Sequence, residues 1–156
     1  MLDEKAMVQR IEPILEYISI TLISGRFKYN LSEEHDDINI RLNSTVDKKL
    51  IDKFETSTSV IEFGSNDDSR NHYERKLNKF LDYSIKEFNQ VNMIINQINA
   101  LPYEYKYILI KGAIFQSSCV QICKKLKMST ATYYRRMHDA KYSLAFTIPE
   151  TFRLKL

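Results

Sequence analysis

The chain has 156 residues with 44% hydrophobic side chains, three glycines, three prolines and two cysteines. So few turn-forming residues exclude an all-β sandwich or barrel, and the composition predicts an all-α protein. The two cysteines stand four residues apart, which suits a reduced helix better than a disulfide framework. No export signal opens the chain and no apolar run approaches the roughly 20 residues of a membrane span, so we expect a cytoplasmic protein.

The charge is divided unequally along the chain. Residues 1–100 carry 13 basic and 17 acidic side chains, whereas residues 101–156 carry 10 basic and 3 acidic ones. A basic segment of this density suits contact with a polyanion, and it equally suits a lysine-rich surface in water. Charge alone leaves both interpretations open.

The first 68 residues predict an acidic, helical N-terminal region that ends in a linker. Apolar side chains recur every three or four positions between residues 3 and 24, as on one helix face, at Met7, Ile11, Ile14, Leu15, Ile18 and Leu22. Gly25 is expected to end this helix, and residues 26–44 predict a loop or linker. A short helix over 46–54 and a strand or loop over 56–63 follow, and the polar stretch 64–69 predicts a boundary between regions 1–68 and 69–156.

A long helix is predicted from Ser69 to Ala100. Its inward positions alternate spacings of four and three, and six of the seven are apolar: Leu77, Leu81, Ser84, Phe88, Val91, Ile95 and Ile98. This period suits a coiled-coil seam, and so a homodimer through Leu77, Leu81, Phe88, Val91, Ile95 and Ile98. It also suits an ordinary core helix that packs on residues 1–24 and 101–115.

The last third predicts three further helices. Leu101 and Pro102 begin the first, with proline at its first position and with buried Tyr105, Ile108, Leu109 and Ala113. Ser117 or Ser118 caps a short helix ending at Leu126, after which Lys127 and Met128 form a tight turn. Ser129 caps the final helix, whose inward positions are Tyr133, Met137, Ala140 and Leu144.

Two helices joined by such a turn predict a helix-turn-helix, whose second helix enters the DNA major groove. Cys123 supplies the small residue needed where the two helices cross, and Tyr133 the bulky residue that faces back. Lys127 stands where a glycine with positive φ is usual.

The run from Ile122 to Lys141 resembles, without gaps, the DNA-reading region 4 of bacterial sigma factors. With the helices before it, residues 70–146 are similar to the ArpU-type late-gene transcriptional regulators of phages and prophages of Gram-positive bacteria. The resemblance implies a regulator, most simply an activator, that binds a late promoter in the cytoplasm of the bacterial host, on its nucleoid. It covers about half of the chain and does not extend to residues 1–69.

The helix wheel assigns roles to the outward side chains of the final helix. At its N-terminal end, where a recognition helix meets base edges, we expect base contacts from Thr130, Ala131, Tyr134, Arg135 and His138. Arginine can donate two hydrogen bonds to guanine, so Arg135 is the principal candidate. Phosphate contacts are expected from Lys124, Lys127, Ser129, Thr132, Arg136 and Lys141.

Other classes of function fit the sequence less well. No phosphate loop, nucleophile elbow or zinc-protease motif is present, and we expect no catalytic residues, cofactor or metal. A phage terminase small subunit, which binds a packaging site as a ring, is one alternative. A protein-interaction module that contacts RNA polymerase is another, and steep salt dependence of binding would favour DNA over it.

Overall fold

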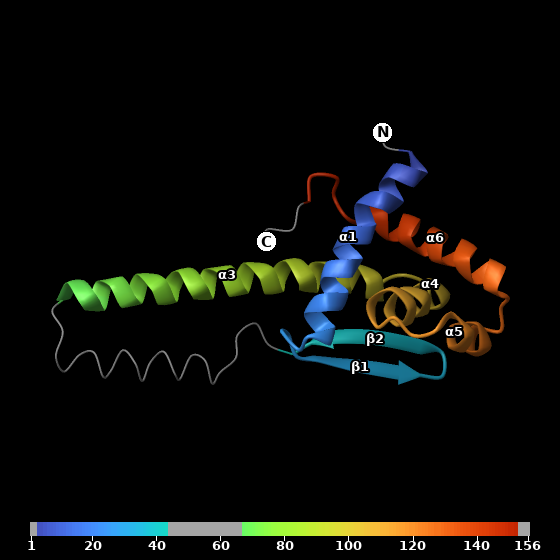
Figure 1. Ribbon diagram of the computed structural model, residues 1–156, viewed down its shortest axis with the longest axis horizontal. Helices are drawn as coiled ribbons and strands as arrows, with labels where there is room; N and C mark the ends of the chain where they lie inside the picture. Colours follow the sequence, from blue (N-terminus) through green and yellow to red (C-terminus); the bar gives the residue numbers. More distant parts are fainter. Residues whose placement is uncertain (1–2, 44–66, 153–156) are drawn as a thin grey trace. The chain divides into compact units, whose positions relative to one another are not determined.

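The computed structural model describes residues 3–43 and 67–152, which are mostly helical. The short helix and the strand or loop predicted between residues 46 and 63 lie outside these ranges. The described residues divide between two units, one of residues 3–43 with 91–152 and one of residues 67–90. In chain order the elements are α1 (Glu4–Ile23), β1 (Tyr29–Glu34), β2 (Asp37–Leu42), α3 (Asp67–Asn99), α4 (Tyr103–Tyr107), the π-helix η1 (Ile108–Ile114), α5 (Cys119–Leu126) and α6 (Thr130–Thr147) (Figure 1).

α1 forms as its sequence predicts. The Asp3 side chain caps it by accepting a hydrogen bond from the Ala6 N–H at 2.7 Å, and Gly25 takes a φ of +77° directly after the helix. Pro13 lies inside the helix. All six predicted apolar positions are buried, and the helix packs against α6 and η1. α1 therefore forms part of the same compact unit as the C-terminal helices.

A β-hairpin corrects the prediction of an all-α fold. β1 and β2 pair antiparallel from Tyr29 opposite Leu42 to Glu34 opposite Asp37, within the stretch predicted as loop or linker. The physical reason is an alternation of period two in β2, whose buried side chains are Ile38, Ile40 and Leu42. This alternation covers only three buried side chains, so it is a weak signal in the sequence.

The hairpin is tied to the helices that follow it. The buried Lys106 of α4 pairs with Asp37, and Lys111 of η1 pairs with Glu33 at 2.9 Å. The Asn99 side chain donates to the Ile40 carbonyl at 2.8 Å and accepts from the Ile40 N–H at 3.1 Å, as a neighbouring strand would. These bonds hold the hairpin to the end of α3 and to α4.

α3 covers the predicted range to within two residues. Its periodic inward positions differ in burial between the two parts of the helix. Val91, Ile95 and Ile98 are at most 1% exposed within the chain itself, as an ordinary core helix requires. Their burial within the chain favours the core-helix alternative over a seam with a second copy at these three positions. Leu77, Leu81, Ser84 and Phe88 are only half-buried.

The helix predicted from Leu101 is divided between α4 and η1. Pro102 is its N-cap rather than its first helical residue, and its carbonyl accepts from the Lys106 N–H at 2.9 Å. Ile108 and Leu109 are buried as predicted, whereas Tyr105 of α4 and Ala113 of η1 are half-buried. η1 ends with the Phe115 N–H bonded to the Ile110 carbonyl at 3.0 Å.

Candidate nucleic-acid interface

The site begins with α5, a short helix with one buried side chain. Ser118, not Ser117, is its cap, because the Ser118 hydroxyl accepts a hydrogen bond from the Gln121 N–H at 3.2 Å. Ile122 is buried, whereas Lys124 and Lys125 are exposed. α5 therefore packs through Ile122 and presents lysines to solvent.

The turn after α5 has the backbone shape that the sequence predicted. Lys127 adopts φ +55° and ψ +52°, the left-handed conformation that glycine usually takes at the end of a helix. The Met128 N–H donates to the Cys123 carbonyl at 3.0 Å and closes the last turn of α5. The chain thus reverses between α5 and α6 within a few residues.

α6 begins at a second capping serine. The Ser129 hydroxyl accepts from the Thr132 N–H at 3.2 Å and donates to the Thr132 hydroxyl at 2.9 Å. Both hydroxyls were expected at phosphates, but in the structure they are engaged in the cap. Tyr133, Ala140 and Leu144 are buried as predicted, and Met137 is half-buried.

Gly112 of η1 allows α6 to approach closely. A Cβ atom at this position would lie 2.6 Å from the Tyr133 hydroxyl oxygen and 2.8 Å from Met137 Cε. Both distances are shorter than van der Waals contact. Burial raises the pKa of Tyr133 above its ordinary value, in keeping with this tight contact. Gly112 therefore has a packing role in the structure.

The opposite end of α6 is held by α1. The Arg10 guanidinium donates to the carbonyls of Ala145, Ile148 and Pro149, each at 2.9 Å. Carbonyl groups at the C-terminal end of a helix lack hydrogen-bond donors within the helix and carry partial negative charge. A guanidinium group supplies both the donors and a positive charge. Sequence reasoning missed Arg10, because nothing near it in the sequence indicates a partner at the far end of the chain.

All five predicted base-contact residues lie on the exposed side of α6: Thr130, Ala131, Tyr134, Arg135 and His138. The Tyr134 side chain is 63% exposed, and its ring meets the Tyr133 ring edge-on at 5.3 Å. His138 differs from the other four, because its Nε2 lies 2.9 Å from a Glu4 carboxylate oxygen of α1. The unobstructed part of this face is therefore the first turn and a half of the helix.

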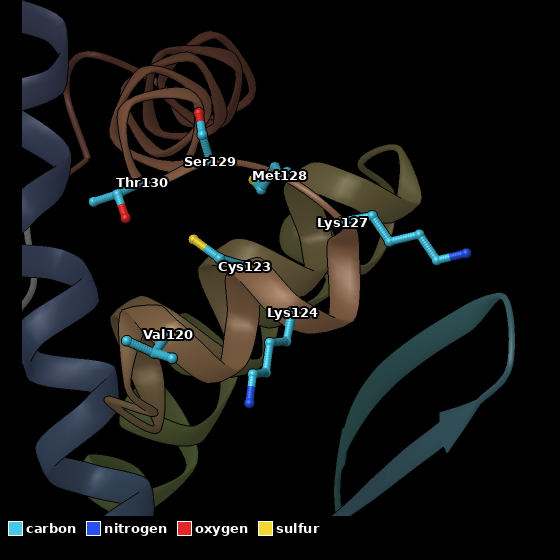
Figure 2. A pocket seen from close by; sticks show the side chains of 7 residues that line it. All are labelled: Val120, Cys123, Lys124, Lys127, Met128, Ser129 and Thr130. Atoms are coloured by element: carbon cyan, nitrogen blue, oxygen red, sulfur yellow. The ribbon is translucent and has the colours of Figure 1, made fainter.

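The predicted phosphate-contact residues separate into two groups. Lys124 and Lys127 are exposed and border an open hollow of about 480 Å³ between α5 and the start of α6. Figure 2 shows the Cys123 sulfur and the Thr130 side chain turned toward this hollow, while the two lysines extend outward from it. Arg136 and Lys141 instead face carboxylates, with Arg136 Nε 3.0 Å from Glu104 and Lys141 Nζ 3.6 Å from Glu12.

Lys125 belongs with the exposed lysines although it was not among the predicted contacts. Lys125 directly follows Lys124 on α5. This pair of adjacent lysines was the sequence signal that could have identified Lys125 as a phosphate contact. Among the residues that the structure describes, Lys124, Lys125, Lys127 and Arg135 have no carboxylate partner. These four side chains, called the basic ridge below, leave their positive charge uncompensated.

The two cysteines lie on neighbouring turns of α5 as free thiols, with their sulfur atoms 3.7 Å apart. Desolvation raises the pKa of Cys123, and the hydrogen bond with Cys119 acts in the same direction, so the protonated form is favoured. Across the described residues, no three His, Cys, Asp or Glu side chains gather in a way that suits a metal ion.

Comparison with models of protein families, with curated proteins and with solved structures finds no match for this chain. In residues 3–43 and 67–152, no helix combines the length and apolar character that a membrane crossing requires.

Proposed function

We propose that the protein is a sequence-specific DNA-binding regulator in which α5 and α6 form a helix-turn-helix of the sigma region 4 type. The observation that carries the proposal is the basic ridge beside the exposed first turns of α6. An α-helix fits the major groove of B-DNA, and base edges are read there by side chains near the start of the recognition helix. Thr130, Ala131, Tyr134 and Arg135 are available for this role.

The basic ridge supports binding to phosphates on either side of the groove. Lys124, Lys125 and Lys127 project from α5 and from the turn, where a helix-turn-helix meets the DNA backbone. Each phosphate that a protein neutralises releases counterions, so the affinity should fall steeply with salt. With Arg135 engaged at a base, the three lysines predict a logarithmic salt slope of about −3.

We further propose the biological role that the resemblance to ArpU-type regulators implies. The protein would bind a late promoter of a phage or prophage, in the cytoplasm of a bacterial host and on its nucleoid, and would most simply act as an activator. A second copy is proposed to join through the half-buried Leu77, Leu81 and Phe88 of α3. Two half-sites would then lie about one DNA turn, or a multiple of it, apart.

The decisive experiment is retention of fragments of the source genome by the purified protein, followed by sequencing, at two salt concentrations. Arg135→Ala is expected to lose about 1–3 kcal/mol on the specific site and to relax one base position. Arg41→Ala is the matched control, because Arg41 is exposed on β2, away from α5 and α6. Equal losses on specific and random DNA for Arg135→Ala would contradict its assignment as a base reader.

A protein partner is the second candidate, because α5 and α6 each expose a large side chain. Val120 is 64% exposed and Tyr134 is 63% exposed, and exposed apolar groups of this size favour protein contacts. Absence of salt-sensitive retention of any DNA fragment would favour this candidate, with RNA polymerase as the first partner to test. Enrichment of a site beside a packaging gene would favour a terminase small subunit instead.

A further inference from the structure

Three basic side chains of α6 that were expected at DNA are paired with carboxylates from other elements. Arg136 lies 3.0 Å from Glu104 of α4, Lys141 lies 3.6 Å from Glu12 of α1, and His138 lies 2.9 Å from Glu4 of α1. Neither α1 nor α4 is adjacent to α6 in the sequence. These carboxylates offset the positive charge of α6 beyond its first turns.

The Arg136 pair is open to exchange with a nucleic acid. The two side chains are 43% and 42% exposed, although the Arg136 Nε that lies nearest Glu104 is itself buried and makes no hydrogen bond with any described residue. A carboxylate and a phosphate offer the guanidinium the same kind of acceptor oxygens, and one can replace the other. Exposed ion pairs are weak, so a phosphate that approaches Arg136 competes with Glu104 on nearly equal terms.

We propose that Glu104 and Glu12 compete with DNA phosphate for Arg136 and Lys141, and so hold back sequence-independent binding. This inference rests on the proposed function. With these two carboxylates in place, Arg135 is the one guanidinium of α6 that the described residues leave uncompensated. The affinity for DNA then depends more on the base that Arg135 contacts and less on the total charge of α6.

The competition predicts that removal of a carboxylate raises affinity for DNA of any sequence. Glu104→Gln keeps the size and polarity of the side chain but frees Arg136. On a random-sequence duplex at low salt, we expect affinity to rise about three- to tenfold, and the logarithmic salt slope to steepen by about 0.9, the value for one added phosphate contact. Glu12→Gln is expected to act in the same direction but less strongly, because its pair with Lys141 is longer.

Two matched variants separate this effect from a general change of charge. Glu16→Gln alters net charge equally at an exposed position of α1 for which the described residues supply no basic partner, and it should leave the affinity nearly unchanged. In an Arg136→Gln background, Glu104→Gln should no longer raise the affinity. Melting temperatures of all variants verify that they are folded.

The outcomes distinguish this inference from the proposed function. Salt-sensitive binding by the wild type with no gain in Glu104→Gln overturns the competition alone. A gain of equal size in Glu16→Gln, or one that persists without Arg136, overturns it as well. Absence of duplex binding by the wild type and every variant overturns both the competition and the proposed function.

Discussion

The contact at Gly112 allows a quantitative prediction about how α6 is positioned. In Gly112→Ala, the new methyl group meets the Tyr133 hydroxyl at 2.6 Å and Met137 Cε at 2.8 Å. The Met137 methyl can move aside, but the Tyr133 ring is rigid and buried. Overpacking of this kind destabilises by about 1–3 kcal/mol, whereas exchange of glycine for alanine in a helix stabilises by about 1 kcal/mol.

The difference of these two terms is a net loss of about 1 kcal/mol (range roughly 0–2) in the free energy of unfolding, or a fall of about 2–4 °C in the melting temperature for a chain of this size. The assay is chemical denaturation of wild type, Gly112→Ala, Tyr133→Phe and the double variant. Because Tyr133→Phe removes the obstructing oxygen, the loss caused by Gly112→Ala should shrink in that background. Stabilisation by Gly112→Ala alone would show that helix propensity dominates and that the close contact does not exist.

Three further predictions concern the elements around α6. Arg10→Ala should lower the free energy of unfolding by about 2–3 kcal/mol, because three charge-assisted hydrogen bonds at the end of α6 are lost. Arg10→Lys keeps the positive charge and should restore part of this stability, and no restoration would argue against a role for the charge. Lys127→Gly should raise stability by about 0.5–1 kcal/mol, since glycine adopts the left-handed turn without strain, and a loss of stability would refute this account of the turn. The hydrogen bond and charge of Lys106 lower the pKa of Asp37, so this carboxylate stabilises the fold above the unfolded-state pKa, and its contribution is lost as the pH falls through the folded-state value. Acid titration of unfolding should therefore show a smaller loss of stability in Asp37→Asn than in wild type, and identical acid profiles would contradict the assignment.

Interactions within a few residues were readable from the sequence. The serine at the start of α6, the left-handed Lys127 and the buried face of α1 all depend on side chains and backbone groups within about one or two helical turns. The exposed positions of α6 followed from the same helical period. The hairpin was missed although Ile38, Ile40 and Leu42 alternate, because so short a run has little weight beside polar neighbours.

The sequence by itself determined the ranges of α1 and α3, the Ser129 cap and the side of α6 that faces solvent, because these features depend on local periodicity and local hydrogen bonds. Only the tertiary structure decided which basic side chains of that helix remain uncompensated. His138 meets a carboxylate 134 residues away, and Arg136 and Lys141 meet carboxylates from two other helices. Such pairs form where folding brings distant segments together, and no local pattern records them. For the same reason, the burial of Val91, Ile95 and Ile98 within one chain became evident only from the packing of the core.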